Sequence, residues 1–224
     1  MENWKSFLVE NKKEKIKNLK YGEITSRRHR RDLTKELEVI DIKMSEIPIT
    51  KYPENDSDEV KQEIKSVLNV MTNNREISKD DLKRADRQPL KLFTKYLKSE
   101  KIKFDQSFLS KIYNDAGKIS LRLKIRYDRP RPEQLGPLLG FDIKSIKTDS
   151  DDTPAYPSGH TMQAWTIAYY LEDKYTEHKD KFYEIAEMIE KSRIVRGAHY
   201  PSDNKEAKRI AKKYLYPNIK RKSR

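Results

Sequence analysis

The sequence predicts an all-α fold, a single-domain helical bundle, on three observations. Apolar residues recur every three or four positions along most of the chain, which is the period of an amphipathic helix. Alternating apolar and polar residues, the pattern of a half-buried strand, are scarce, and we find no internal repeat. With 224 residues, 35% of them hydrophobic, the chain is long enough for one domain with a substantial core.

The helix signals begin near the amino terminus. Apolar residues at helical spacing predict helices within residues 4–19, 33–44 and 60–71. Ser57 or Asp58 can cap the last of these helices. Residues 48–58 contain two prolines and several turn formers, which is typical of a loop.

The middle of the chain contains the clearest helix of the first half. Ser78 opens a short helix with a start that resembles a capping box, and Pro89 begins the next helix. A long amphipathic helix begins at Asp105 or Ser107 and breaks at residues 128–132. Residues 133–156 look irregular, and a loop of this length inside a compact domain usually serves a site.

The last third predicts three further helices. The apolar run from Met162 to Leu171 is too short to span a membrane and predicts a buried core helix. A second amphipathic helix covers residues 180–198. After a turn, Ser202 can cap a final helix, or Pro201 can open that helix at its first position.

The charge composition favours anionic partners. The net charge is +13 and 38% of the residues are charged, which suits phosphorylated substrates, nucleic acid or a membrane surface. The alternative is an ordinary lysine-rich surface, because 36 acidic residues are interspersed among 49 basic ones. The run Arg27-Arg28-His29-Arg30-Arg31 could bind nucleic-acid phosphates, but a solvated helix face is the favoured interpretation.

Cysteine content and apolar runs indicate in which cellular compartment the protein is expected. The sequence has no cysteine, which excludes disulfides and cysteine-based zinc sites and leaves the redox compartment open. The first residues, Met1-Glu2-Asn3-Trp4-Lys5, lead into charged sequence without a secretory h-region, and no apolar run reaches about 18 residues. We therefore expect a cytoplasmic protein without a transmembrane segment.

Three short stretches carry the chemistry, and Pro157-Ser158-Gly159-His160 is the first. A tight turn followed by a helix presents free backbone N–H groups, which suit an anion, and a histidine there would face that anion. In the second stretch, Lys124 stands near a helix end and Arg131 lies in a proline-restrained turn, where both can contact phosphate oxygens.

The third stretch contains Ser192-Arg193 and, further on, His199 and Asp203. If Pro201 opens a helix, Asp203 lies in its first turn within reach of the His199 ring. A carboxylate that accepts from Nδ1–H would leave Nε2 free as a nucleophile. The alternative is that Asp203 only complements the helix dipole.

Together the three stretches resemble the signature of the PAP2 (type 2 phosphatidic acid phosphatase) superfamily, which also includes vanadium haloperoxidases. Its pattern is Lys, six residues, Arg-Pro; then Pro-Ser-Gly-His; then Ser-Arg, five residues, His, three residues, Asp. Every position is filled here, in order. The local sequence around His160 and His199 is most similar to that of soluble bacterial class A acid phosphatases.

The resemblance implies a helical bundle of the PAP2/haloperoxidase type and a metal-independent phosphomonoester hydrolase. It implies that His199 is the nucleophile that forms a phosphohistidine, oriented by Asp203, and that His160 is the general acid and base. Phosphate oxygens would be bound by the remaining signature residues, Lys124, Arg131, Ser158, Gly159 and Arg193. No cofactor is expected, although vanadate could occupy the phosphate site.

Three alternatives stay open: a lipid phosphate phosphatase, a vanadium-dependent haloperoxidase, and a basic nucleic-acid-binding protein. Location is open as well, because acid phosphatases of this type are periplasmic. The expected division of the chain is an amino-terminal helical region without a recognised signature (1–75), a PAP2-type core (76–217) and a basic tail (218–224). The natural substrate, a small phosphorylated molecule, is not identified by the sequence, and neither is any homo-oligomer.

Overall fold

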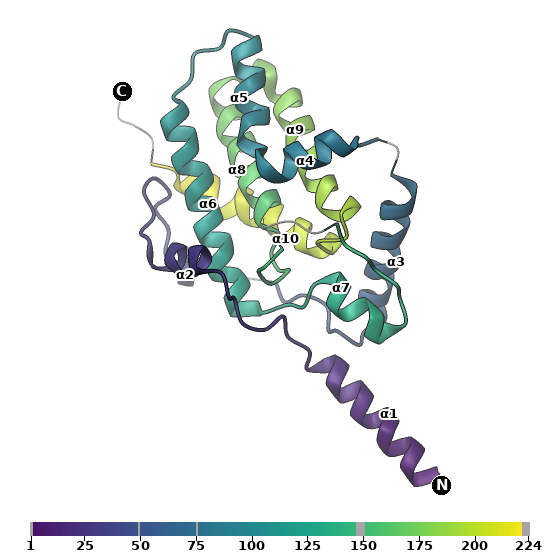
Figure 1. Cartoon of the computed structure of the whole chain (residues 1–224). Coiled ribbons are helices and arrows are strands. Elements are labelled where there is room, and N and C mark those ends of the chain that lie inside the picture. The colour runs from purple at the N-terminus through teal and green to yellow at the C-terminus, as the bar shows by residue number, and fades with distance from the viewer. Residues whose placement is uncertain (1, 49, 75, 147–150, 221–224) are drawn as a thin grey trace.

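The computed structural model describes residues 2–48, 50–74, 76–146 and 151–220, and these residues form an all-α bundle (Figure 1). Among them the only β-type pairing is an isolated bridge between Ile40 and Ile219. The α-helices are α1 (Glu2–Lys17), α2 (Arg27–Thr34), α3 (Asp58–Asn73), α4 (Lys79–Arg87), α5 (Pro89–Ser99), α6 (Gln106–Tyr127), α7 (Pro132–Leu135), α8 (Gly159–Lys174), α9 (Lys179–Val195) and α10 (Pro201–Ile210). Short helical segments are η1 (Met44–Glu46), η2 (Gly136–Leu139), η3 (Thr176–His178), η4 (Ala211–Leu215) and η5 (Tyr216–Asn218). The predicted all-α class is confirmed.

Helix α8 is the centre of the bundle. It packs against α6, α9 and α10, which surround it in Figure 1. Apolar side chains cover most of its circumference, as expected for a helix enclosed on all sides, and Met162, Trp165 and Leu171 are fully buried. The predicted core helix is therefore confirmed.

The predicted helix starts are confirmed by side-chain caps. Ser57 accepts a hydrogen bond from the Val60 N–H at the start of α3, and Ser78 and Asp105 act in the same way at α4 and α6. Helix α6 ends where Asp128 adopts a left-handed conformation, with φ of 48°. That turn directs the chain from Lys124 towards Arg131.

The helix predicted within residues 33–44 is wrong beyond Thr34. Residues 35–43 are not helical, because the buried carboxylate of Asp115 binds their backbone. Its Oδ2 accepts from the N–H groups of Glu38 and Val39 at 2.7 Å and of Ile40 at 3.1 Å. An acceptor from α6 thus replaces the hydrogen bonds that a local helix would supply.

Two predictions near the site need smaller corrections. The stretch 133–156, expected to be irregular, contains most of α7 and all of η2, and its other described residues, 140–146 and 151–156, are irregular. Ser202 does not cap α10, because Pro201 is the first residue of that helix and Tyr200 occupies the cap position. The alternative prediction, that Pro201 opens the last helix, is confirmed.

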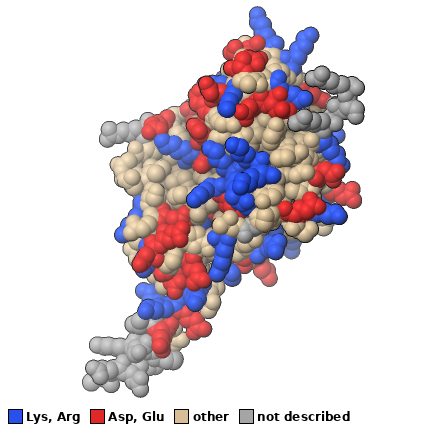
Figure 2. All heavy atoms as spheres, turned by 180° about the vertical axis from the view of Figure 1, so that it is seen from behind, with Lys and Arg blue, Asp and Glu red and all other residues tan. Residues whose placement is uncertain are grey.

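The outer parts of the molecule are polar. Helix α1 extends away from the bundle in Figure 1, and the Asn55 amide donates to the carbonyl oxygens of Ile16 and Leu19 at its end. On the face seen in Figure 2, Lys and Arg lie among Asp and Glu. Helix α2, which contains residues 27–31, has no buried residue. Among the described residues, no helix has both the length and the apolar character needed to cross a membrane.

Candidate active site

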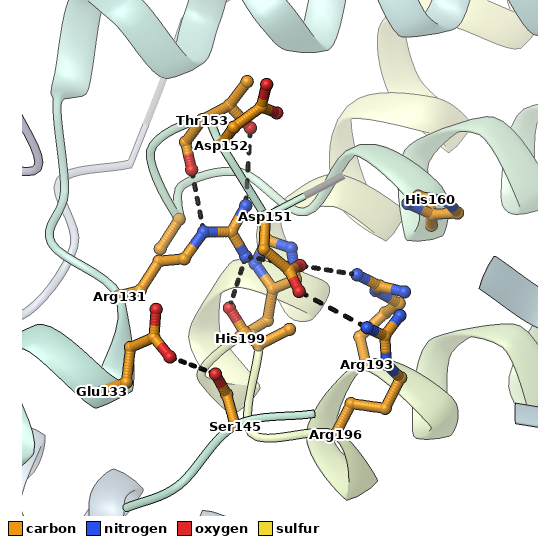
Figure 3. Close-up of polar contacts among 12 residues, drawn as sticks. Arg131, Glu133, Ser145, Asp151, Asp152, Thr153, His160, Arg193, Arg196 and His199 are labelled. Atoms are coloured by element: carbon orange, nitrogen blue, oxygen red, sulfur yellow. Dashed lines mark hydrogen bonds and ion pairs between the residues drawn. The ribbon is translucent and has the colours of Figure 1, made fainter. Parts of the chain in front are cut away.

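The fold brings the three signature stretches to one place. The turn after α6 carries Arg131, the first turn of α8 carries His160, and the segment from the end of α9 into α10 carries Arg193 and His199. Figure 3 shows Arg131, His199 and Arg193 gathered around Asp151, with His160 to one side. The segments meet because α8 packs on both α6 and α9.

His199 and Asp203 form a buried pair one helical turn apart. His199 Nδ1 lies 3.1 Å from Asp203 Oδ2, which also accepts the Tyr200 N–H at 2.9 Å. Burial lowers the pKa of His199 well below its ordinary value, and the positive charges of Lys124 and Arg131 lower it further. A neutral His199 that donates from Nδ1 to the carboxylate keeps an unprotonated Nε2, which is the form a nucleophile requires.

Arg131 is buried and held mainly by backbone oxygens. Its Nε donates to the Thr153 carbonyl oxygen and one terminal nitrogen donates to the Ala198 carbonyl oxygen, both at 2.8 Å. The same terminal nitrogen lies 3.4 Å from Asp151 Oδ1. The Ala198 contact places the guanidinium group next to His199, so an anion bound by Arg131 would lie near the candidate nucleophile.

Asp151 links Arg131 to two arginines on α9 and just after it. Its Oδ1 lies 3.3 Å from an Arg193 nitrogen, and its Oδ2 lies 3.4 Å from an Arg196 nitrogen (Figure 3). One carboxylate therefore contacts three guanidinium groups. An anionic ligand of these arginines would compete with Asp151.

Asp86, at the end of α4, is a second carboxylate that binds Arg193 and Arg196. Arg193 donates to Asp86 Oδ1 at 2.8 Å, and Arg196 donates to the same oxygen. Although burial opposes the effect, Arg193 and Arg196 hold the pKa of Asp86 well below its ordinary value. Asp86 is therefore an ionised counter-charge that orients both side chains.

Asp86, Asp151 and Arg196 contact the signature arginines but were not predicted from the sequence. Arg196 had a usable signal, because it follows Arg193 by three residues and so lies on the same helical face. Asp86 had no signal of that kind, since it lies 107 residues from Arg193 in the sequence. Asp151 stands in the predicted site-serving loop, but nothing local marked it.

Lys124 lies beside the first turn of α8, next to Gly159. A Cβ on Gly159 would lie 3.2 Å from Ser120 Oγ, which is tight, and 3.7 Å from Lys124 Cε, which is ordinary van der Waals contact. The Lys124 ammonium group donates to the carbonyl oxygens of Pro154 and Ala155. Burial and the nearby Arg131 lower the pKa of Lys124 well below its ordinary value.

Ser158 is buried and precedes the first turn of α8. Its N–H donates to the Asp203 carbonyl oxygen at 3.1 Å, and its hydroxyl shares a hydrogen bond of 2.9 Å with Thr161. The backbone bond joins the α8 turn to the first turn of α10. Ser158 and the His199–Asp203 pair are thus parts of one connected structure.

His160 is half-buried, and its Nε2 lies 2.9 Å from the Asp86 carbonyl oxygen. Burial lowers the pKa of His160 to about 3, and the positive charge of Arg193 contributes. The imidazole is therefore neutral near pH 7 in the ligand-free protein. A bound anion would raise this pKa, because a negative charge favours the protonated ring.

Residues 108–206 match the family model described as the PAP2 superfamily. These residues form a PAP2 superfamily domain. The PAP2 domain contains every residue that the signature named, from Lys124 to Asp203, whereas Asp86 lies before it. The resemblance found in the sequence is therefore confirmed for this part of the chain.

Known proteins resemble parts of the chain. Over 108 residues it is 30% identical to a non-specific acid phosphatase of Providencia stuartii. That match covers 46% of this chain and 42% of the acid phosphatase, so the chain spans less than half of its relative's length. A crystal structure of a transmembrane PAP2 type phosphatidylglycerolphosphate phosphatase from Bacillus subtilis is 18% identical. The structural match covers 70% of this chain and 82% of the Bacillus subtilis chain, with a TM-score of 0.48.

Proposed function

We propose that this protein is a phosphatase that hydrolyses phosphomonoesters through a phosphohistidine on His199. The observation that carries the proposal is the buried His199–Asp203 pair. The Nδ1 of His199 is engaged by Asp203 at 3.1 Å, and His199 lies close enough to Lys124 and Arg131 for their charges to lower its pKa. A nucleophile with an oriented tautomer and surrounding cations suits attack on a phosphoryl group.

The reaction would proceed in two steps. Binding of the anionic substrate raises the pKa of His160, so that the ring takes up a second proton at Nδ1. In the first step, the Nε2 lone pair of His199 attacks phosphorus, the ester P–O bond breaks, and the protonated His160 gives its Nδ1 proton to the departing alkoxide oxygen. In the second, His160 takes a proton from water as the water oxygen attacks phosphorus and the P–N bond breaks, which releases inorganic phosphate and restores His199. Asp203 stabilises the imidazolium-like character that develops on His199 during each step.

The phosphoryl oxygens would be bound by the buried cations. Arg131 and Arg193 each offer a planar pair of donors, and Lys124 adds a third positive charge. Charge grows on the equatorial oxygens during phosphoryl transfer, so these groups would lower the barrier without a metal ion. The Gly159 N–H, at the start of α8, and the Ser158 hydroxyl would complete the set.

The substrate would be a small phosphomonoester of broad type. The similarity to a non-specific acid phosphatase supports this class, within the length that the two proteins share. Inorganic phosphate, and vanadate as its analogue, would bind in the same place.

The test is a phosphate-release panel combined with trapping of the intermediate. We expect the wild-type protein to release phosphate from nucleotides and sugar phosphates in the presence of EDTA, and acid quenching to trap a labelled phosphoenzyme. His199→Gln should lose activity by at least about 10³-fold and trap no label. The matched control is His178→Gln. His178 stands just before α9, forms a hydrogen bond with Tyr96 of α5, and has no contact with a signature residue among the described residues.

Other outcomes would redirect the assignment. Release from micellar phosphatidate alone would indicate a lipid phosphate phosphatase, and halide oxidation with vanadate and peroxide would indicate a haloperoxidase. Full activity of His199→Gln would overturn the proposal.

A further inference from the structure

Arg129 lies directly behind the His199–Asp203 pair. Its guanidinium group is fully buried and donates to Asp203 Oδ1 at 2.6 Å, the carboxylate oxygen that His199 does not use. It also stacks on the Tyr200 ring, with 3.8 Å between Cζ and the ring centroid. Asp203 is therefore held at both oxygens, by His199 and Tyr200 N–H at Oδ2 and by Arg129 at Oδ1.

Glu63 of α3 holds Arg129 and the start of α10 together. Glu63 Oε2 accepts from the second terminal nitrogen of Arg129 at 2.8 Å and from the Ser202 hydroxyl at 2.9 Å. Glu63 Oε1 accepts the Ser202 N–H at 2.7 Å. That N–H belongs to the first turn of α10, where no partner within the helix exists and where negative charge is favoured.

The charges of this group are arranged alternately. Arg129 stands between the carboxylates of Glu63 and Asp203, which raise its pKa further above its ordinary value although burial opposes them. Burial raises the pKa of Asp203, and Arg129 is the main group that opposes this and favours the ionised form. The negative charge of Glu63 itself raises the pKa of Asp203, so Glu63 favours the ionised form only by holding Arg129 beside Asp203.

Glu63 lies outside the PAP2 domain and in the region of the chain that carries no signature. Four hydrogen bonds nevertheless connect Glu63 to the first turn of α10, which contains Asp203. Glu63 accepts three of them, from Arg129, the Ser202 N–H and the Ser202 hydroxyl. Arg129 donates the fourth to Asp203. The distances are all 2.9 Å or less, so the arrangement is a closed ring rather than a loose surface ion pair.

We propose that Glu63 is a positioning residue that, through Arg129, fixes the ionisation and orientation of Asp203 and hence the tautomer of His199. Without Glu63, Arg129 loses one of its two anionic partners and Ser202 loses the acceptor of its N–H. The Asp203 carboxylate can then turn away from His199 Nδ1, and protonation at Nε2 blocks attack. The catalytic consequence rests on the function proposed above, whereas the tautomer is a property of the free protein.

The experiment compares Glu63→Gln and Glu63→Ala with the control Glu59→Gln. Glu59 is an exposed residue one turn earlier on α3, so its substitution removes the same charge from the same helix. The readouts are the ring-nitrogen NMR signals of His199 and the kinetic constants for a phosphomonoester. We expect wild type and Glu59→Gln to show the Nδ1-protonated neutral ring, and both Glu63 variants to show a mixture of tautomers.

In kinetics, we expect both Glu63 variants to lower kcat by about 10-fold and to change KM by less than about twofold. In an Asp203→Asn background, the Glu63 substitutions should lower kcat by much less than about 10-fold, because Glu63 acts through Asp203. If Glu63→Ala does not fold, the isosteric Glu63→Gln decides the question.

Two results would overturn the proposal. One is a wild-type tautomer and kcat in the folded Glu63→Gln protein. The other is lower thermal stability with an unchanged His199 spectrum, which would make Glu63 a structural residue alone. A wild-type protein that releases no phosphate would refute the proposed function, and the NMR comparison would still decide whether Glu63 sets the tautomer.

Discussion

His160 Nε2 donates its proton to the main-chain carbonyl oxygen of Asp86 at 2.9 Å. A carbonyl oxygen can only accept, so this hydrogen bond assigns the proton to Nε2 and leaves Nδ1 as the nitrogen that can gain or lose one. The Asp86 carboxylate meanwhile holds Arg193. Asp86 therefore sets the tautomer of His160, the candidate acid, and orients the side chain of Arg193, a candidate phosphate-binding residue.

Replacing His160 should slow the reaction in a way that depends on the leaving group. His160→Gln should reduce kcat by about 10²–10⁴-fold for an alkyl phosphate, because that leaving oxygen needs a proton. The reduction should be much smaller for p-nitrophenyl phosphate, whose phenolate leaves without one. The measurement is kcat for the two esters with wild type and variant. Equal losses for both esters would contradict the role of His160 as an acid.

The stability of the ligand-free protein should fall on acidification below about pH 6.5. The pKa of His160 is about 3 in the folded protein against an ordinary value of 6.5, and that of His199 is lowered as well. Between these values the unfolded chain binds more protons than the folded protein, so stability is fully present above pH 6.5 and is lost as pH falls towards 3.

Thermal unfolding from pH 7 to pH 4 checks this expectation. Tm should decrease steadily for the wild type, and the decrease should be smaller for His160→Gln, which has one fewer group to protonate. Saturating inorganic phosphate should also reduce the decrease, because a bound anion favours protonated histidine. A flat Tm across this range would show that neither histidine is held neutral.

Removing the charge of Asp151 should strengthen binding of phosphate analogues. Its carboxylate contacts Arg131, Arg193 and Arg196, so an incoming anion must displace it. Asp151→Asn keeps the size and removes the competing charge, and we expect the inhibition constant for vanadate to fall by about 10-fold. Weaker inhibition would show instead that Asp151 serves to orient the arginines.

The control for that experiment is Asp152→Asn at the adjacent position. Asp152 Oδ1 lies 3.2 Å from His29 Nδ1 of α2, and among the described residues the Asp152 carboxylate contacts none of the three arginines. Its substitution should leave vanadate inhibition within about twofold of wild type, since a partly exposed pair contributes little.

Removing the Asp115 carboxylate should destabilise the fold. Asp115 is fully buried, accepts from the backbone of residues 38–40, and pairs with Lys118 at 3.0 Å. Asp115→Ala leaves these three backbone donors without their acceptor and leaves Glu38, at 3.7 Å, as the carboxylate nearest to Lys118. We expect a cost of about 3–5 kcal/mol in the free energy of unfolding. Chemical denaturation measures the loss. Asp41→Ala, which removes an exposed carboxylate nearby, should change stability by less than about 0.5 kcal/mol.

Much of the fold was predictable because its signals are local. The caps at Ser57, Ser78 and Asp105 each bind a backbone N–H three residues further along, so neighbouring residues suffice to recognise them. The His199–Asp203 pair was predictable for the same reason, since Pro201 begins the helix and places the carboxylate within reach of the ring.

Other features were decided only by which helices pack together. The segment 35–43 has a helical pattern but is not helical, because Asp115 of α6 takes its N–H groups from 75 to 77 residues away. Asp86 and Glu63 reach the site from α4 and α3 across 107 and 66 residues. The sequence by itself determined the helices and the signature residues, through periods and contacts that span one or two turns. The tertiary structure alone determined the partners of the buried charges, because a charge removed from water must be matched by whichever opposite charge the packing brings beside it.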